Sequence, residues 1–144
     1  MMRKKGFTLI EIMLVVIIIG ILASLIMPNF TGKATEAKIA SARTDINGTL
    51  STVLDMYELD SGIFPSTEQG LKALLEKPES QPEPKNWKGP YLKKKQGLKD
   101  PWGNEYLYES PGKNNKDYDL SSSGPDGVAG NDDDITNWDT EKTE

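Results

Sequence analysis

Residues 3–27 read RKKGFTLIEIMLVVIIIGILASLIM, and the architecture of the whole chain follows from this segment. Between Phe7 and Met27 most side chains are Leu, Ile, Val or Met, and the one ionisable side chain is Glu11. A helix of this length covers about 30 Å, one hydrocarbon thickness. The apolar side chains favour insertion by about 4–8 kcal/mol in total, whereas one Glu opposes it by roughly 3 kcal/mol. The segment is therefore predicted to be a membrane-spanning helix.

The basic residues before this segment predict its orientation. Arg3, Lys4 and Lys5 favour a cytoplasmic location for the N-terminal end, so residues after Pro28 are predicted to lie on the opposite side of the membrane. A cleavable secretory signal, which would release a soluble module, is the alternative. It requires a shorter apolar core and a small-residue cleavage site, and 23–24 is a poor site because more apolar residues follow it.

The helical pattern continues beyond the membrane segment. Apolar residues recur at spacings of three and four: Ala34, Ala37, Ile39, Ala42, Ile46, Leu50, Val53, Leu54 and Tyr57. This pattern predicts one long helix from Phe7 to about Glu58, ended by Asp60-Ser61-Gly62. Pro28 lacks a backbone N–H, so a kink or local melting is predicted there.

The remaining chain predicts a small α+β head. Ser66 and Gln69 have the spacing of a capping box, so a short helix is expected to follow them, with Leu71, Leu74 and Leu75 facing the long helix. Residues 106–108 and 118–120 flank a polar turn and predict two antiparallel strands. The predicted fold class is α+β, with a long N-terminal helix on a small antiparallel sheet.

Composition excludes several classes of function. The formal net charge is −5, and no basic stripe is present, so a nucleic-acid partner is not expected. The chain has no His and no Cys, which removes the commonest general base and the usual zinc ligands. No nucleophile motif or paired-carboxylate pocket is evident, so no enzymatic activity is predicted.

An acidic segment lies near the C-terminus. Between Asp117 and Glu141 there are eight acidic residues and no Lys or Arg. Carboxylates, Asn and backbone carbonyls are the hard oxygen ligands that suit Ca²⁺, and the glycines of this segment allow the backbone to curl inward. A solvated acidic tail is the alternative. The apolar Ile135 and Trp138 beyond the segment favour a loop that returns to the body of the head.

The stretch Gly6-Phe7-Thr8-Leu9-Ile10-Glu11 resembles the class III signal of type IV pilins and pseudopilins. The resemblance implies that a prepilin peptidase cleaves between Gly6 and Phe7 and methylates the new amine of Phe7. It also implies an assembly role for Glu11. A buried carboxylate is costly alone and far less costly when paired, so Glu11 of one subunit is expected to meet the Phe7 amine of another in a filament. The alternative is that Glu11 reaches the membrane interface.

Further motifs extend the resemblance over almost the whole chain. STEQGLKALL, GPYL, DPWGNEY, GPDGVAGNDDDI and NW resemble, in this order, the major pseudopilin family of type II secretion systems. The resemblance implies one structural Ca²⁺ in the C-terminal loop. Its ligands would be the side chains of Asp126, Asp133 and Asp134, the backbone carbonyls of Ser123 and Val128, and Asn131.

The resemblance also implies domain organisation and partners. Residues 1–6 would be a leader, 7–27 a transmembrane and filament-core helix, and 28–144 a periplasmic head. The subunit would wait in the bacterial inner membrane, polymerise with itself, and work with minor pseudopilins, an inner-membrane platform and a secretion ATPase. A type IV pilin of a surface fibre is the alternative function.

Overall fold

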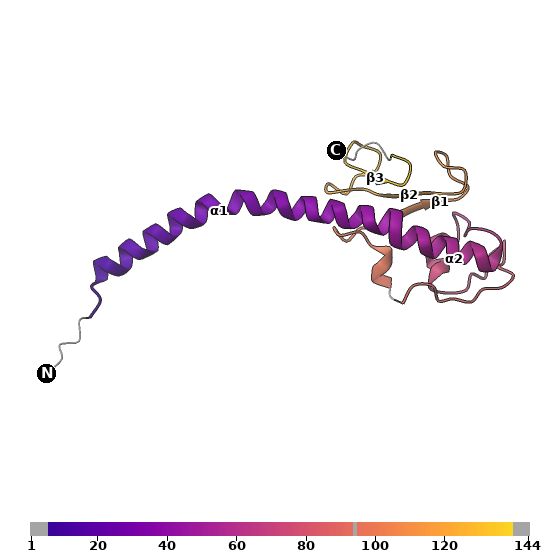
Figure 1. Ribbon diagram of the computed structural model, residues 1–144, viewed down its shortest axis with the longest axis horizontal. Coiled ribbons are helices and arrows are strands. Elements are labelled where there is room, and N and C mark those ends of the chain that lie inside the picture. The colour runs from indigo at the N-terminus through magenta and orange to yellow at the C-terminus, as the bar shows by residue number, and fades with distance from the viewer. Residues whose placement is uncertain (1–5, 94, 140–144) are drawn as a thin grey trace. The chain divides into compact units, whose positions relative to one another are not determined.

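The computed structural model describes residues 6–93 and 95–139, and for residues 25–31, 95 and 96 it describes the backbone alone. The chain divides into two compact units, Met1–Glu36 and Ala37–Glu144, which we describe separately. In the first unit the described secondary structure is helical. The second unit contains the sheet and the short helices (Figure 1). Of the predicted leader, only Gly6 lies within the described residues.

Three consecutive helical segments form the predicted long helix. Helix α1 spans Leu9–Thr44, the π-helical segment η1 spans Asp45–Leu50, and α2 spans Ser51–Ser61. The run ends where the sequence predicts, because Gly62 adopts a left-handed φ of 78° and donates its N–H to the Glu58 carbonyl at 2.6 Å. Glycine reaches this conformation without the steric penalty of a side chain.

The sequence predicts either a kink or local melting at Pro28. The backbone of α1 stays helical through Pro28, so the prediction of local melting is wrong for this structure. The large apolar side chains between Phe7 and Leu22 are exposed, among them Phe7 at 82% and Ile10 at 75%. No described helical stretch is both long and apolar enough to cross a membrane. The predicted span, residues 7–27, extends into residues whose side chains lie outside the description.

The π-helical segment is a feature that the sequence pattern did not predict. Ala42, Ile46, Leu50 and Leu54 are spaced by four residues, and all four are fully buried. In a regular α-helix each step of four residues rotates the side chain by about 40° around the axis. The wider turns of η1 reduce this drift, so the four side chains remain on one face and contact one core.

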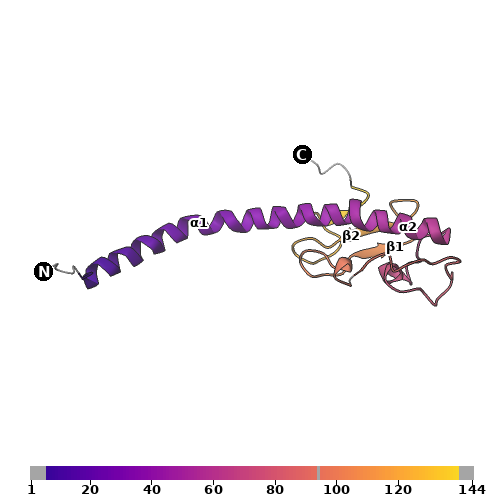
Figure 2. The same cartoon turned by 60° about the horizontal axis from the view of Figure 1, so that its bottom comes forward.

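The head contains a three-stranded antiparallel sheet in the order β1-β2-β3. Strand β1 spans Leu107–Glu109, β2 spans Asp119–Ser122 and β3 spans Ile135–Thr136. The two predicted strands are confirmed with a shift of about one residue, and Tyr108 pairs with Leu120. The third strand is new, and its pairing of Ile135 with Ser122 returns the acidic segment to the head. The sheet lies alongside the helical run of this unit (Figure 2).

The core of the head lies where the sheet and the short segments meet this helical run. Its buried apolar residues are Ala42, Ile46, Leu50, Val53, Leu54, Tyr57, Leu71, Ala73, Leu74, Tyr106, Tyr118, Leu120 and Ile135. The predicted short helix is the 3-10 segment η2, Gly70–Leu74, and a second 3-10 segment, η3, spans Lys95–Leu98. Of the three leucines predicted to face the long helix, Leu71 and Leu74 are buried and Leu75 is half-buried.

The predicted capping box before η2 is confirmed. The Ser66 N–H donates to Gln69 Oε1 at 3.0 Å, and the Gln69 N–H donates to Ser66 Oγ at 3.3 Å. Gln69 Nε2 also donates to the carbonyls of Ser80 and Pro82, at 2.8 and 3.0 Å. One side chain therefore caps a helix and holds the proline-rich loop 77–85 against it.

Candidate functional sites

The predicted processing site lies ahead of the first helical turn. Gly6 and Phe7 have no regular secondary structure, and a Cβ placed on Gly6 would have no neighbour within 4 Å. Phe7 is 82% exposed. The peptide bond between them is therefore open on all sides in the described part of the chain, as a protease substrate must be.

Glu11 caps its own helix. The Thr8 N–H donates to Glu11 Oε2 at 3.2 Å, and the Glu11 N–H donates to Thr8 Oγ1 at 3.3 Å. This reciprocal pair satisfies two amide donors that the first turn of a helix leaves without partners. The carboxylate also lies at the positive end of the helix dipole. These interactions lower the cost of a carboxylate in an apolar segment, and they were not predicted from the sequence.

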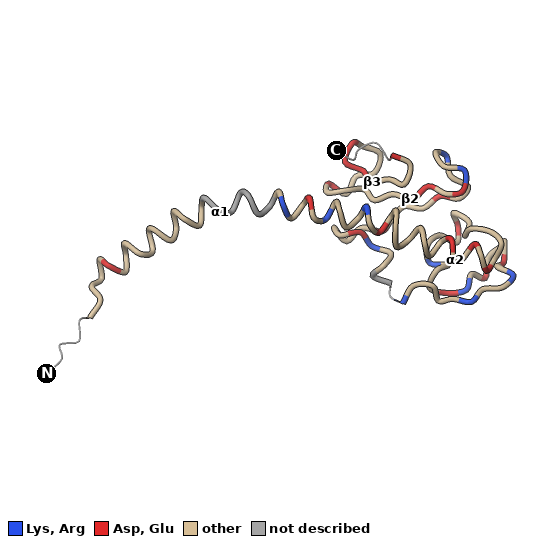
Figure 3. The backbone as a smooth tube through the Cα atoms, viewed as in Figure 1, with Lys and Arg blue, Asp and Glu red and all other residues tan. Residues whose placement is uncertain are grey.

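The predicted calcium loop, residues 123–134, connects β2 to β3. The pairing of Ser122 with Ile135 brings its two ends together, so the loop is closed at its base by the sheet. Figure 3 marks the positions of its acidic residues in red along the backbone between β2 and β3. The segment is therefore a loop held at both ends, as the apolar residues beyond it predict, and not a free tail.

Gly124 makes the tightest turn of the loop. Its φ is +64°, and a Cβ at this position would overlap the Asp133 carbonyl oxygen and lie 3.1 Å from Asp133 Oδ2. The backbone at Gly124 thus approaches Asp133 more closely than any side chain would allow. This contact joins the first residues of the loop to the last ones.

The predicted side-chain ligands contact one another through this loop. Asp126 Oδ1 accepts the Val128 N–H at 2.8 Å, and its Oδ2 accepts Asn131 Nδ2 at 2.8 Å. Asn131 Oδ1 accepts the Asp133 N–H at 3.2 Å, and Asp133 Oδ2 accepts the Asp126 N–H at 3.2 Å. The loop therefore gathers these three side chains into one hydrogen-bonded ring.

Asp134 is hydrogen-bonded to the loop backbone through one oxygen only. Its Oδ2 accepts the Gly130 N–H at 2.7 Å, whereas its Oδ1 is buried and has no hydrogen-bond partner. A buried acceptor without a partner carries a desolvation penalty that a bound cation would remove. A hard oxygen acceptor of this kind is chemically suited to Ca²⁺.

The predicted ligands differ in their burial. Ser123 is buried at the base of the loop, whereas Val128 is 59% exposed at its tip. Within the described residues, no three His, Cys, Asp or Glu side chains converge closely enough to form a ready-made metal site. The donors share one loop, and binding of one ion by three of its carboxylates would require these side chains to come closer together.

Two further acidic residues organise loops of the head, and the sequence analysis assigned them no role. Asp119 is buried on β2, and its Oδ2 accepts the N–H groups of Lys113 and Asn114 at 2.8 and 2.9 Å. Asp100 is buried in the turn at residues 100–103, and its Oδ1 accepts the N–H groups of Trp102 and Asn104 at 3.0 and 2.8 Å. The turn signal Asp-Pro-x-Gly could have identified Asp100, because an Asp at the first position of a turn accepts amides further along it.

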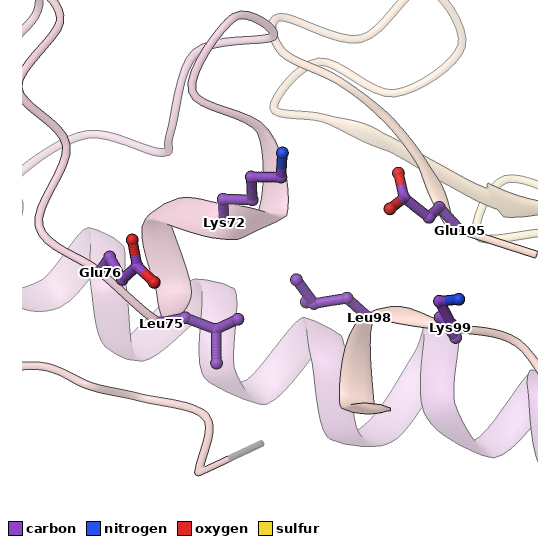
Figure 4. Close-up of a pocket in the computed structure, with 6 residues that line it drawn as sticks. All are labelled: Lys72, Leu75, Glu76, Leu98, Lys99 and Glu105. Carbon is purple, nitrogen blue, oxygen red and sulfur yellow. The ribbon is translucent and has the colours of Figure 1, made fainter. Parts of the chain in front are cut away.

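A pocket of about 330 Å³ lies between η2 and the segment around η3. Leu75 and Leu98 point into it, and four charged residues surround them: Lys72, Glu76, Lys99 and Glu105 (Figure 4). Two cations and two anions balance, so the pocket has no net charge that would attract an ionic ligand. We assign no chemistry to it.

Comparison with known proteins decides the family. The family model described as "Type II secretion system (T2SS), protein G" matches residues 29–138, and the "Prokaryotic N-terminal methylation motif" matches residues 1–27. The chain belongs to the protein G family of type II secretion systems. The family assignment agrees with the resemblance seen in the sequence, and it favours this family over type IV pilins of surface fibres.

Relatives of known name support the assignment over nearly the full length. The "Type II secretion system core protein G" of Pectobacterium carotovorum is 48% identical over 141 residues, which are 97% of this chain and 88% of that protein. The protein of the same name from Pseudomonas aeruginosa is 50% identical, over 95% of this chain and 96% of that protein. The protein of the same name from Escherichia coli K12 is 47% identical, over 94% and 92%.

A solved structure confirms the fold. The major pseudopilin from the type 2 secretion system of enterohaemorrhagic Escherichia coli matches with a TM-score of 0.66 and 43% identity, over 77% of this chain and 95% of that chain. The predicted α+β fold of the type IV pilin-like class is thus confirmed. The methylation motif and the protein G family together imply a membrane-anchored subunit that faces the periplasm. The family is one of structural subunits, in agreement with the prediction that the chain is not an enzyme.

Proposed function

We propose that this chain is the major structural subunit of a type II secretion pseudopilus, which polymerises through its N-terminal helix and supports export of folded proteins through the outer membrane. The observation that carries this proposal is the combination of a processing signal with an exposed apolar helix. From Leu9 to Leu22 the large apolar side chains are all about half exposed or more. Such a surface requires a bilayer or neighbouring copies of the same helix.

Processing would come first. A prepilin peptidase would cleave the exposed bond between Gly6 and Phe7 and methylate the new amine, removing three basic residues of the leader. The Phe7 amine would then be a cation one helical turn from Glu11. Since Glu11 Oε2 already accepts the Thr8 N–H, its Oε1 remains available to a second donor. In the filament we expect that donor to be the Phe7 amine of a neighbouring subunit, so the pairing would set the axial register.

Assembly would take place at the bacterial inner membrane. The subunit would span it once, with the N-terminus in the cytoplasm and the head in the periplasm, as the basic leader predicts. A cytoplasmic secretion ATPase and an inner-membrane platform would add subunits, and minor pseudopilins would cap the filament. These partners follow from the family, and no residue of the chain identifies them individually.

Calcium would complete the head. The side chains of Asp126, Asp133 and Asp134 would hold the ion, with Asn131 and the carbonyls of Ser123 and Val128 as further donors. The ion would supply positive charge that cancels the repulsion among the carboxylates and joins both ends of the loop. The buried Oδ1 of Asp134 and the close approach of Gly124 to Asp133 support this proposal.

The decisive experiment is complementation of a strain that lacks its protein G but retains the other secretion components. We expect this chain, or a variant adapted to that host, to restore export of a folded exoprotein and to yield a mature N-terminus that is a methylated Phe7. Long surface fibres at native expression, with no restored export, would favour a type IV pilin instead. A mature chain that begins beyond residue 24 would identify a secreted soluble module.

A further inference from the structure

A buried carboxylate outside the calcium loop contacts the base of that loop. Asp100 is 5% exposed, and its two oxygens have separate roles. Oδ1 accepts the two amides of its own turn, and Oδ2 accepts the hydroxyl of Ser122 at 2.7 Å. Ser122 is the last residue of β2 and is fully buried. The turn at residues 100–104 is thus joined to the strand from which the loop departs.

Ser122 passes this constraint to the loop itself. Its Oγ accepts the N–H of Gly124 at 3.2 Å. A serine hydroxyl has one proton and two lone pairs, so donation to Asp100 leaves the oxygen free to accept from Gly124. The peptide group between Ser123 and Gly124 is therefore held by the Ser122 side chain. The carbonyl of Ser123 is one of the proposed calcium ligands, and Gly124 is the residue that approaches Asp133.

The same turn contacts the loop at a second point. Gly127 has a φ of +71°, and a Cβ placed there would lie 3.3 Å from Asn104 Nδ2. Asn104 is the residue whose N–H is held by Asp100 Oδ1. The Asp100 carboxylate thus orients both Asn104, which lies next to Gly127, and Ser122, which accepts the Gly124 N–H.

We infer that Asp100 is a positioning residue for calcium, which fixes the calcium loop through the hydrogen bonds Asp100–Ser122 and Ser122–Gly124. The inference rests on the proposed calcium site. Asp100 Oδ2 accepts the Ser122 hydroxyl at 2.7 Å and so holds that hydroxyl in one orientation. Without that acceptor, the hydroxyl proton would compete for the position that Gly124 N–H occupies, and the loop would lose its fixed start.

The test is calcium titration of the full chain in detergent micelles, with variants that separate loop geometry from general stability. Asp100→Asn keeps the shape and the Oδ1 acceptor but replaces Oδ2 with a donor. Ser122→Ala removes the hydroxyl that joins Asp100 to Gly124 and deletes only one oxygen atom. We expect both to weaken calcium binding by about 10–100-fold, as loss of supporting hydrogen bonds does at other metal sites.

Asp119→Asn is the matched control. Asp119 is a carboxylate of similar burial, at the opposite end of β2, and it holds a different loop. This variant is expected to lower the melting temperature and to leave calcium affinity within about twofold, because sites without shared partners behave independently. Amide hydrogen exchange at Gly124, measured in chelator, supplies a readout that does not involve the metal. We expect faster exchange in Asp100→Asn and Ser122→Ala and no change in Asp119→Asn.

The outcomes distinguish the two proposals. If the unmodified chain does not bind calcium, both the calcium proposal and this inference are wrong. A second outcome is that the unmodified chain binds calcium and Asp133→Ala abolishes binding, while Asp100→Asn and Ser122→Ala bind normally. In that case the calcium site stands and the positioning role is overturned. Equal weakening in Asp119→Asn and Asp100→Asn would also overturn it, since general stability would then explain the loss.

Discussion

Thr8 and Glu11 cap each other at the start of α1, with the Thr8 N–H 3.2 Å from Glu11 Oε2. The one acidic residue of an apolar segment therefore already has a structural role in the isolated subunit. The capping box and the proposed contact with a neighbouring Phe7 amine use different oxygens of the same carboxylate. Substitution can separate them, because Gln caps a helix as Glu does but carries no charge.

The first prediction concerns this charge. Glu11→Gln is expected to insert into the membrane and to be processed normally, but to assemble poorly, since it cannot pair with the Phe7 amine. Glu11→Ala loses the cap as well and should also assemble poorly. The measurement is the fraction of subunit recovered in sheared filaments. Normal assembly of Glu11→Gln would show that the cap, and not the ion pair, is the role of Glu11.

The second prediction concerns processing. A bulky residue at Gly6, as in Gly6→Val, is expected to leave residues 1–6 on the chain, because the proposed cleavage site lies directly after Gly6. Intact-mass spectrometry would then detect the unprocessed and unmethylated chain. Gly20→Val, in a helical position with no neighbour within 4 Å, is the control and should be cleaved. Cleavage of the Gly6 variant between 6 and 7 would contradict the prediction.

The third prediction concerns calcium removal. At a calcium concentration about 100-fold above the dissociation constant, binding adds about 2.7 kcal/mol to the free energy of unfolding. For a head of this size that amounts to a melting temperature higher by on the order of 10 °C. Chelator should abolish the difference, and Asp133→Ala should melt at the same temperature with and without calcium. If neither calcium nor chelator changes the melting temperature of the unmodified chain, the proposed calcium site is wrong.

The fourth prediction concerns the turn at Gly124. Gly124→Ala combines a left-handed φ with overlap between the new Cβ and the Asp133 carbonyl, so we expect destabilisation by about 1–3 kcal/mol and weaker calcium binding. Gly130→Ala is the matched control, because Gly130 has a φ of +95° but an added Cβ would have no neighbour within 4 Å. Gly130→Ala therefore introduces backbone strain without a steric overlap. Chemical unfolding of both variants in chelator measures the difference, and equal losses would show that the contact with Asp133 is unimportant.

The fifth prediction concerns acid stability. Burial of Asp119 opposes its ionisation, but the amides of residues 113–115 and the Asn114 side chain outweigh burial and lower its pKa below the ordinary value. A carboxylate with a lowered pKa in the folded state contributes stability that is fully present above the unfolded value, about 4, and is lost as pH falls through the folded value. Asp119→Asn should therefore reduce the loss of stability below pH 4. Unfolding curves of both proteins between pH 7 and pH 2 test this, and identical acid dependence would contradict it.

The local features of this chain followed from its sequence alone. The long helix, its end at Gly62 and the capping box of Ser66 and Gln69 depend on residues within one or two turns of each other, so spacing and composition suffice to predict them. The N-terminal signal is likewise a contiguous motif. The family and its fold class followed because motifs of this kind occur in a fixed order along the chain.

Other features depend on contacts that only the tertiary structure creates. Strand β3 has two residues and no strand signal of its own, and it exists because Ser122 and Ile135 meet across the closed loop. The π-helical turns of η1 arise because four side chains must face one core. Asp100 contacts Ser122 across 22 positions of sequence, so no local pattern reveals the pair. Sequence determined which residues could bind a cation, and tertiary structure decided which of them lie together and what holds them in place.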